Sequence, residues 1–283
     1  MSVVVPGSLP EVHEAIERHP DAQLLAGGTD FMVEVNFGHR RPTSVVALSQ
    51  VPELRGWRVD GDTVVIGACC TYRELEQPEL AAEVPALAQA ARTVGSPQIR
   101  NAGTIGGNLA TASPAGDTLP ALAALDARIV VASSSGVRTV GVEELVVGPK
   151  RTTLQHDDVI VEIHVPVVDG PQEFLKIGTR NAMVIAVAGL ALVLDRAART
   201  VRCALGSVGP TVLRARDAEE WVAGEIDWHS GTLTDPGVAA EFGRRVAAAA
   251  RPIDDHRSTA AYRRHGIEVL AQRAITRALG RIA

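Results

Sequence analysis

Two glycine-bearing segments carry the residues of this chain whose types and spacing favour ligand chemistry. The first is Leu24-Leu25-Ala26-Gly27-Gly28-Thr29-Asp30, and the second contains Thr104-Ile105-Gly106-Gly107-Asn108. Each segment places glycines beside a small hydroxylated residue and leaves backbone N–H groups uncovered by side chains. Such amides are fixed donors that suit an anion. Two segments of this kind that face each other would grip one diphosphate, so the pattern predicts a dinucleotide-binding protein.

Each segment also has a simpler interpretation. Ala-Gly-Gly-Thr is typical of an ordinary turn, and Asp30 of an ordinary helix cap. The second segment resists this interpretation, because the 14 residues from Gly95 to Asn108 contain four glycines and little hydrophobic material. Neither segment fits GxGxxG or GxxxxGK[ST], so Rossmann and P-loop sites are not favoured.

Polar side chains beside the glycines extend the predicted site. Thr29 and Thr104 add hydroxyl donors, and the Asn108 amide both donates and accepts. Asp117 lies nine residues beyond Asn108, at a predicted helix start. Its carboxylate would repel a phosphate but suits the hydroxyls of a sugar.

The composition excludes several classes of protein. The 283 residues carry a net charge of -5 with no basic run, which argues against nucleic acid as the main ligand. No apolar stretch reaches the roughly 20 residues of a spanning helix, and the N-terminus does not read as a signal peptide. Cys69, Cys70 and Cys203 form no CxxC pair, so we expect reduced thiols in a cytoplasmic protein without its own metal site. Lysine occurs only at Lys150 and Lys176, which we interpret as composition bias.

Capping residues and turns predict the elements of the first 170 residues. Ser8 and Glu11 form a capping box for a helix that ends before His19-Pro20. Thr71 and Glu74 predict a second box at a short helix. The other expected elements are strands at 23–25, 44–48, 64–68, 128–132 and 159–165, and helices at 31–35, 85–94 and 117–125.

A third unit begins after the turn at Asp169-Gly170-Pro171. Residues Met183 to Asp195 are apolar and β-branched, which predicts a buried strand that pairs with Val201 to Val208 in a hairpin. The chain ends in an amphipathic helix whose apolar face holds Ile267, Leu270, Ala271, Ala274, Ile275, Ala278 and Leu279. We therefore expect units at 1–57, 58–170 and 171–283.

The second segment, followed by Ser113-Pro114-Ala115-Gly116-Asp117, closely resembles the FAD-binding medium subunit of the molybdenum hydroxylases. That family includes bacterial carbon monoxide dehydrogenase and xanthine dehydrogenase. The resemblance covers nearly the whole chain and extends to residues 26–30, 174–180, 252–257 and 262–264. It implies an α+β chain with a vanillyl-alcohol-oxidase (PCMH-type) FAD-binding fold of two α/β subdomains, followed by a C-terminal three-stranded sheet with helices.

The resemblance also implies FAD as the cofactor and assigns residues to it. One side of the diphosphate takes Leu24, Leu25, Ala26, Gly27, Gly28, Thr29 and Asp30, and the other side takes Thr104, Ile105, Gly107 and Asn108. Asp117 would bind a cofactor hydroxyl, and Ile160 or Val161 would present backbone to the adenine or the ring end. Lys176 would stabilise negative charge on the flavin. No residue is assigned as a catalytic acid or base.

The implied function is electron transfer within a larger enzyme. A large molybdopterin-binding subunit would oxidise the substrate, and a small subunit with two [2Fe–2S] clusters would pass the electrons on. This chain would deliver them to an acceptor such as NAD, quinone or oxygen, in a heterotrimer that is commonly doubled. Asn181-Ala182-Met183-Val184 stand where some relatives carry acidic residues. The alternatives are a stand-alone FAD-dependent oxidoreductase and a dinucleotide-binding module that only regulates.

Overall fold

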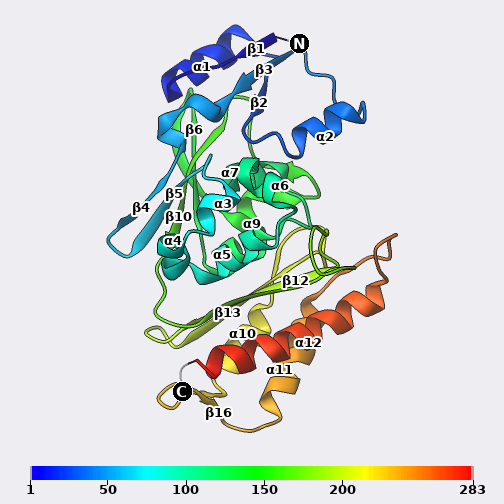
Figure 1. Ribbon diagram of the computed structural model, residues 1–283. Helices are drawn as coiled ribbons and strands as arrows, with labels where there is room; N and C mark the ends of the chain where they lie inside the picture. Colours follow the sequence, from blue (N-terminus) through cyan, green and yellow to red (C-terminus); the bar gives the residue numbers. More distant parts are fainter. Residues whose placement is uncertain (1, 282–283) are drawn as a thin grey trace.

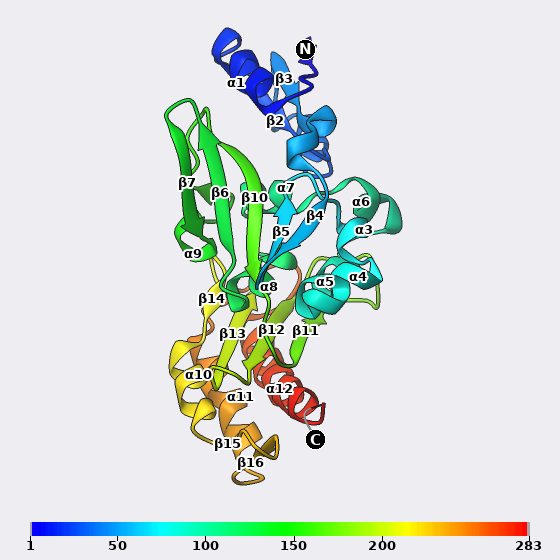
Figure 2. The same ribbon diagram turned by 90° about the vertical axis from the view of Figure 1, so that its left-hand side faces the viewer.

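The three largest sheets lie one after another along an elongated molecule in the computed structural model, which describes residues 2–281 (Figure 1). The N-terminal sheet lies at one end, a five-stranded sheet in the middle, and a C-terminal sheet with its helices at the other end. Figure 2 shows the same succession from the side, with the long middle strands β6, β7 and β10 rising toward the N-terminal sheet. The α+β architecture predicted from the sequence is confirmed.

The N-terminal sheet is parallel and has the strand order β1-β3-β2. Its elements are β1 (Ser2–Val4), α1 (Leu9–Arg18), β2 (Gln23–Leu25), α2 (Phe31–Asn36) and β3 (Ser44–Ala47). The Ser8 hydroxyl caps α1 as predicted, by accepting from the Glu11 amide. The reciprocal half of the predicted capping box is wrong, because the Glu11 carboxylate accepts from the Gly7 amide at 2.7 Å.

The middle sheet is antiparallel and has the strand order β4-β5-β10-β6-β7. Its strands are β4 (Trp57–Asp60), β5 (Thr63–Gly67), β6 (Arg128–Ser133), β7 (Gly136–Gly141) and β10 (Val159–Pro166). Around it lie α3 (Tyr72–Leu75), α4 (Pro78–Glu83), α5 (Pro85–Arg92), α8 (Thr118–Ala124), α9 (Val142–Leu145), β8 (Val146–Gly148) and β9 (Arg151–Thr152). Thr71 and Glu74 make the predicted capping box at α3. Between Ile160 and Glu162 the register of β10 against β6 shifts, which marks a bulge at Val161.

The second glycine segment folds as two short helices rather than as the predicted open loop. They are α6 (Pro97–Ala102) and α7 (Ile105–Thr111). Each has a hydroxyl cap, since Ser96 accepts from the Ile99 amide and Thr104 accepts from the Gly107 amide. The caps compensate for the low helix propensity of the glycines.

The C-terminal sheet has the strand order β11-β12-β13-β14, one short strand more than predicted. Its strands are β11 (Gln172–Ile177), β12 (Ala188–Asp195), β13 (Thr200–Gly206) and β14 (Leu213–Arg214). The predicted hairpin of β12 and β13 is confirmed. The predicted start of β12 at Met183 is wrong: Met183 has a left-handed φ of 52° and an exposed side chain. Arg180 holds this turn by donating to the Ala182 and Met183 carbonyls.

Strand β12 is buried on both faces, which explains why its sequence does not alternate between apolar and polar residues. Leu190, Leu192 and Leu194 belong to one hydrophobic cluster, whereas Ala191 and Val193 belong to another. Helix α8 packs against β12 and β13, and every residue of α8 is buried. The remaining elements are α10 (Arg216–Ala223), β15 (Ile226–Asp227), β16 (Thr232–Leu233), α11 (Val238–Ala249) and α12 (Ala260–Leu279). Among residues 2–281, no helix is both long and apolar enough to cross a membrane.

The C-terminal helical layer provides a stability test. Phe242 on α11 is completely buried among apolar side chains, whereas Phe37 is 73% exposed. We expect Phe242→Ala to lower the free energy of unfolding by about 3–5 kcal/mol, because it removes a ring and leaves a cavity. Phe37→Ala is the matched control and should change it by less than about 0.5 kcal/mol. Urea unfolding of both variants checks this, and similar losses would contradict the assigned core.

Candidate functional site

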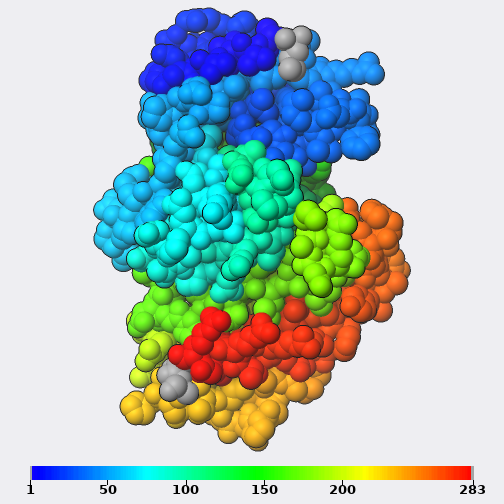
Figure 3. All heavy atoms as spheres, in the orientation of Figure 1, coloured from blue at the N-terminus to red at the C-terminus, as the bar shows by residue number. Residues whose placement is uncertain are grey.

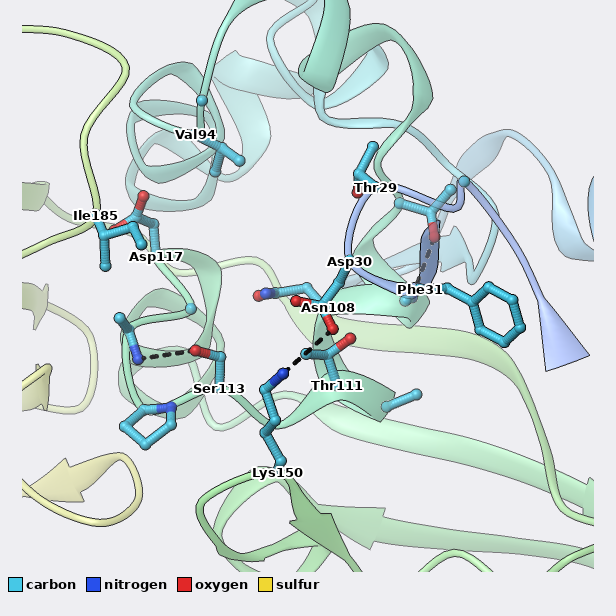
Figure 4. A pocket seen from close by; sticks show the side chains of 18 of the residues that line it. Thr29, Asp30, Phe31, Val94, Asn108, Thr111, Ser113, Asp117, Lys150 and Ile185 are labelled. Carbon is cyan, nitrogen blue, oxygen red and sulfur yellow. Dashed lines mark hydrogen bonds and ion pairs between the residues drawn. The ribbon is translucent and has the colours of Figure 1, made fainter. Parts of the chain in front are cut away.

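One cavity of about 1200 Å³ is lined by residues of β2, by Ile160 of β10 and by residues next to the strands of the C-terminal sheet, such as Ser207. It is larger than the about 300–1,000 Å³ of a typical small-ligand pocket, and therefore suits a dinucleotide. Figure 4 shows Thr29, Asp30 and Phe31 on one side of the cavity and Val94, Asp117 and Ile185 on another. Figure 3 shows the chain near residue 180 (yellow-green) beside the chain near residue 250 (orange). Both segments contribute lining residues to the cavity, such as Ile185 and Arg251.

The two glycine segments touch each other at the wall of this cavity. A Cβ atom added to Gly27 would lie 1.8 Å from the Ala102 carbonyl oxygen, which no side chain tolerates. A Cβ added to Gly103 would lie 3.1 Å from the Thr29 hydroxyl oxygen. Glycine is thus required at Gly27 because backbone packs directly on backbone. The predicted juxtaposition of the two segments is confirmed.

The first segment presents backbone amides that the fold itself does not use. Within residues 2–281, the N–H groups of Gly27, Gly28 and Thr29 have no hydrogen-bond acceptor. Gly28 adopts a left-handed φ of 72°, a conformation that glycine takes without strain. All three residues line the cavity. A row of uncommitted amides along a cavity wall is the donor set that an anion requires.

The second segment behaves differently, and the prediction that it offers its amides is wrong for residues 105–108. The Ile105 amide donates to the Cys70 carbonyl at 3.0 Å, and the Gly106 amide to the Ala68 carbonyl at 2.8 Å. The Gly107 and Asn108 amides donate to the hydroxyl and the carbonyl of Thr104. These four amides are therefore already hydrogen-bonded within the protein. On this side of the cavity, only side chains remain to contact a ligand.

Asn108 is the best oriented of those side chains. The Thr118 hydroxyl donates to Asn108 Oδ1 at 2.6 Å, which fixes the direction of the amide. The Thr118 bond therefore leaves the NH₂ group of Asn108 as the donor of this side chain. Asn108 lines the cavity together with Thr104. This side therefore offers an amide donor and a hydroxyl that donates or accepts.

Asp117 and Lys176 form a buried ion pair. Lys176 Nζ lies 2.6 Å from Asp117 Oδ2 and 3.2 Å from the Thr93 carbonyl oxygen. Both side chains are 8% exposed. Burial raises the pKa of Asp117 to about 6, although the charge and the hydrogen bond of Lys176 oppose that rise. Asp117 lines the cavity, whereas Lys176 contacts Asp117 without lining the cavity itself.

The structure brings most of the predicted site residues to this one cavity. Those that line it are Leu24, Leu25, Ala26, Gly27, Gly28, Thr29, Asp30, Thr104, Gly107, Asn108, Asp117 and Ile160. Ile105, Val161 and Lys176 are not among the lining residues. The Ile105 side chain is buried in the core. The Val161 carbonyl, at the bulge in β10, accepts from the Ala68 amide at 2.9 Å.

The sequence interpretation missed several polar groups of the cavity. Lys150 and Arg40 line it beside the first segment, and Arg263 and Ser207 line it at the C-terminal sheet. The Ser207 hydroxyl and Arg263 Nε are buried and have no hydrogen-bond partner among residues 2–281. Arg263 donates its other groups to the Val187 and Ser207 carbonyls and to Asp255. The scarcity of lysine was the available signal, because both lysines lie at this site.

The cysteines are inert thiols in this fold. Cys69, Cys70 and Cys203 are buried and form no disulfide. Burial raises the pKa of Cys69 to about 11 and that of Cys70 to about 12. These residues therefore remain protonated at neutral pH, and Cys69 enters the cavity wall as an apolar surface.

Comparison with protein families identifies the class to which this fold and cavity belong. Residues 1–168 match the FAD-binding domain of molybdopterin dehydrogenases, and residues 173–278 match the C-terminal domain of the carbon monoxide dehydrogenase flavoprotein. The chain belongs to this family: it is an FAD-binding oxidoreductase subunit of the molybdenum-hydroxylase type. The predicted family, fold class and cofactor are confirmed.

Individual relatives agree along nearly the whole chain. The carbon monoxide dehydrogenase medium chain of Hydrogenophaga pseudoflava is 35% identical over 93% of this chain and 91% of its own. The nicotinate dehydrogenase FAD-subunit of Eubacterium barkeri is 34% identical over 77% of this chain and 78% of its own. In solved structures, a carbon monoxide dehydrogenase from H. pseudoflava has a TM-score of 0.89 at 31% identity, covering 100% of this chain and 98% of its own. Quinoline 2-oxidoreductase from Pseudomonas putida 86 has a TM-score of 0.91 at 27% identity, with the same coverage.

The contact between the glycine segments makes Gly27→Ala a specific test. The new methyl group would meet the Ala102 carbonyl oxygen at 1.8 Å, so the two segments must separate. We expect FAD to be lost and the free energy of unfolding to fall by about 1–3 kcal/mol. Gly224→Ala is the control, because its Cβ would lie at an ordinary 3.5 Å from the nearest atom, outside the cavity. A Gly27→Ala protein with wild-type flavin content and stability would contradict this account.

The Asp117 carboxyl predicts a pH-dependent term in stability. Its pKa is raised in the fold, so its protonated form is favoured there. The stabilising contribution is complete below pH 4 and is lost as the pH rises through about 6. Between pH 4.5 and 7, wild type should lose roughly 1–3 kcal/mol of unfolding free energy relative to Asp117→Asn. Urea titrations across this range measure the difference, with the exposed Asp60→Asn as control. A pH-independent difference would show that the pKa of Asp117 is not raised.

Proposed function

We propose that this chain is the electron-transfer subunit of a molybdenum hydroxylase complex. It takes electrons from [2Fe–2S] clusters of a partner subunit and passes them to a terminal acceptor such as NAD, quinone or oxygen. The observation that carries the proposal is the cavity of about 1200 Å³ on which both glycine segments converge. Bound FAD supplies a carrier that exchanges electrons singly or in pairs. The residues of the chain supply its position and electrostatic surroundings.

The residues of the cavity fit FAD by their chemistry. In this proposal the amides of Gly27, Gly28 and Thr29 bind the diphosphate, and Asn108 and Thr104 bind it from the opposite side. Asp117 accepts from a cofactor hydroxyl, and Lys176 fixes Asp117 at 2.6 Å. Ile160 contributes an apolar wall to the same cavity. Each group binds or orients FAD, and we assign no residue as a catalytic acid or base.

We also propose that residues 1–57, 58–170 and 171–283 act as three domains around this cavity. The three largest sheets support the division, because each lies within one of the three ranges apart from Trp57, the first residue of β4. Each domain contributes residues to the cavity wall: Gly27 belongs to the first, Asn108 to the second and Ser207 to the third. In this arrangement FAD is held by all three domains.

The proposed partners are a large molybdopterin-binding subunit and a small subunit with two [2Fe–2S] clusters, in a heterotrimer that is commonly doubled. The names of the relatives support this, since they describe medium chains or FAD-subunits of dehydrogenases. The alternative is a stand-alone FAD-dependent oxidoreductase.

Purification of the full chain by itself separates the two functions. We expect a yellow protein whose flavin is reduced by dithionite but which oxidises no hydroxylase substrate. Co-expression with the neighbouring large and small subunits should give a complex with molybdenum, iron and FAD that oxidises such a substrate. Substrate turnover by the isolated chain would favour the stand-alone enzyme, and a colourless chain that takes up no FAD would overturn both functions.

A further inference from the structure

The proposed cofactor site leaves a charge to be neutralised. A diphosphate carries two negative charges, and the amides of Gly27, Gly28 and Thr29 provide only partial positive charge. The second segment adds little, because its amides at residues 105–108 are bonded within the protein. The carboxylates of Asp30 and Glu34 also line the cavity on this side. An anion at the first segment therefore requires a cation close by.

Lys150 is placed to supply that cation. It lies in the turn between β8 and β9, and its backbone amide donates to the Ala112 carbonyl at 2.9 Å. Its Nζ lies 3.6 Å from Asp30 Oδ2 and forms an ion pair with Glu34. Figure 4 shows the side chain directed at Asp30, the residue that ends the first glycine segment. Lys150 is 52% exposed at its side chain and lines the cavity.

Two features distinguish Lys150: its ammonium group stays charged, and its backbone adopts an uncommon conformation. The hydrogen bond to Glu34 raises the pKa of Lys150, and the same bond lowers the pKa of Glu34. The Lys150 backbone adopts a left-handed φ of 54°, which is uncommon for a residue with a side chain. Such strain persists where the surroundings impose it, and it clusters at binding sites.

The other cations of the cavity wall bond to groups outside the first glycine segment. Arg40 bonds to Glu34 at 3.0 Å and its guanidinium lies 5.0 Å from the centre of the Phe31 ring. At the C-terminal sheet, Arg263 donates to two backbone carbonyls and to Asp255, and Arg257 pairs with Asp255 at 3.5 Å. Among the cavity-lining cations of residues 2–281, Lys150 is the one that forms an ion pair with the first glycine segment, through Asp30.

We propose that Lys150 completes the diphosphate site as a positioning cation, with Asp30 and Glu34 directing its ammonium group toward the anion. This inference rests on the proposed function and adds a residue to its cofactor site. The first segment's side of the site then holds neutral amides together with a flexible ammonium group, opposite the side chains of Thr104 and Asn108. A lysine suits this role because its long stem lets a point charge follow the phosphate oxygens.

The test measures binding to the full-length chain after its flavin has been removed. Titration calorimetry with FAD, ADP and adenosine separates the diphosphate from the rest of the cofactor. We expect Lys150→Met to weaken FAD and ADP roughly three- to tenfold, a modest loss because the side chain is half exposed. Adenosine binding should not change. The salt dependence of ADP affinity should also become shallower, since one charge has been removed.

Two further variants control for structural effects. Lys150→Arg keeps the charge and should retain most of the ADP affinity. Arg58→Met breaks an exposed ion pair with Glu162, outside the cavity, and should leave all three affinities unchanged.

The outcomes separate this inference from the proposed function. Equal losses for adenosine and ADP would show that Lys150 only supports the local fold and would overturn the proposal, as would unchanged ADP binding in Lys150→Met. In both cases a wild-type chain that binds FAD leaves the proposed function standing. Failure of the wild-type chain to bind FAD would instead overturn the function.

Discussion

Backbone packed on backbone is the constraint on which the cavity depends. Where Gly27 meets Ala102 and Gly103, the fold leaves no room for a Cβ atom. This contact joins the end of a strand in the N-terminal sheet to the caps of α6 and α7, which belong to the middle of the chain. The amides of the first segment consequently lie along the cavity wall rather than in solvent. This close contact therefore places the uncommitted amides beside the segment that carries Asn108.

The two glycine segments resemble each other in sequence but contribute differently. The amides of Gly27 and Gly28 remain free of hydrogen bonds within residues 2–281. The Gly106 amide instead donates to the Ala68 carbonyl, and the Gly107 amide donates to the Thr104 hydroxyl. The glycines of the second segment serve close approach: a Cβ on Gly106 would lie 2.7 Å from both the Cβ and the carbonyl oxygen of Ala68. Asn108, oriented by Thr118, supplies the polar contact instead. A glycine pattern therefore indicates tight packing, and a hydrogen-bond inventory is needed to decide whether its amides are available.

Local signals predicted those parts of the molecule that depend on local physics. Helix α1, strand β2, the capping box at Thr71 and the hairpin of β12 and β13 follow from caps, turns and apolar runs. Residues 183–187 were misassigned because Val184 and Ile185 favour a strand, whereas the fold uses these residues at the cavity wall. The pairing of Asp117 with Lys176 spans 59 residues, and that of Glu34 with Lys150 spans 116. Local sequence patterns carry no information about such distant contacts, so Glu34 and Lys150 emerged as cavity residues only from the folded chain.

Helix α8 has a mechanical consequence. It begins directly after Asp117, and its seven buried residues pack on β12 and β13 of the C-terminal sheet and on α5 and α7 of the middle part of the chain. The C-terminal sheet cannot slide past α5 and α7 without exposing this apolar helix to water, so the buried contact opposes such a motion. The Asp117 carboxyl, which directly precedes α8, is therefore held by packed secondary structure rather than by a flexible loop. A protein that docks on the C-terminal helices would therefore bind a surface that packed contacts connect to the wall of the cavity.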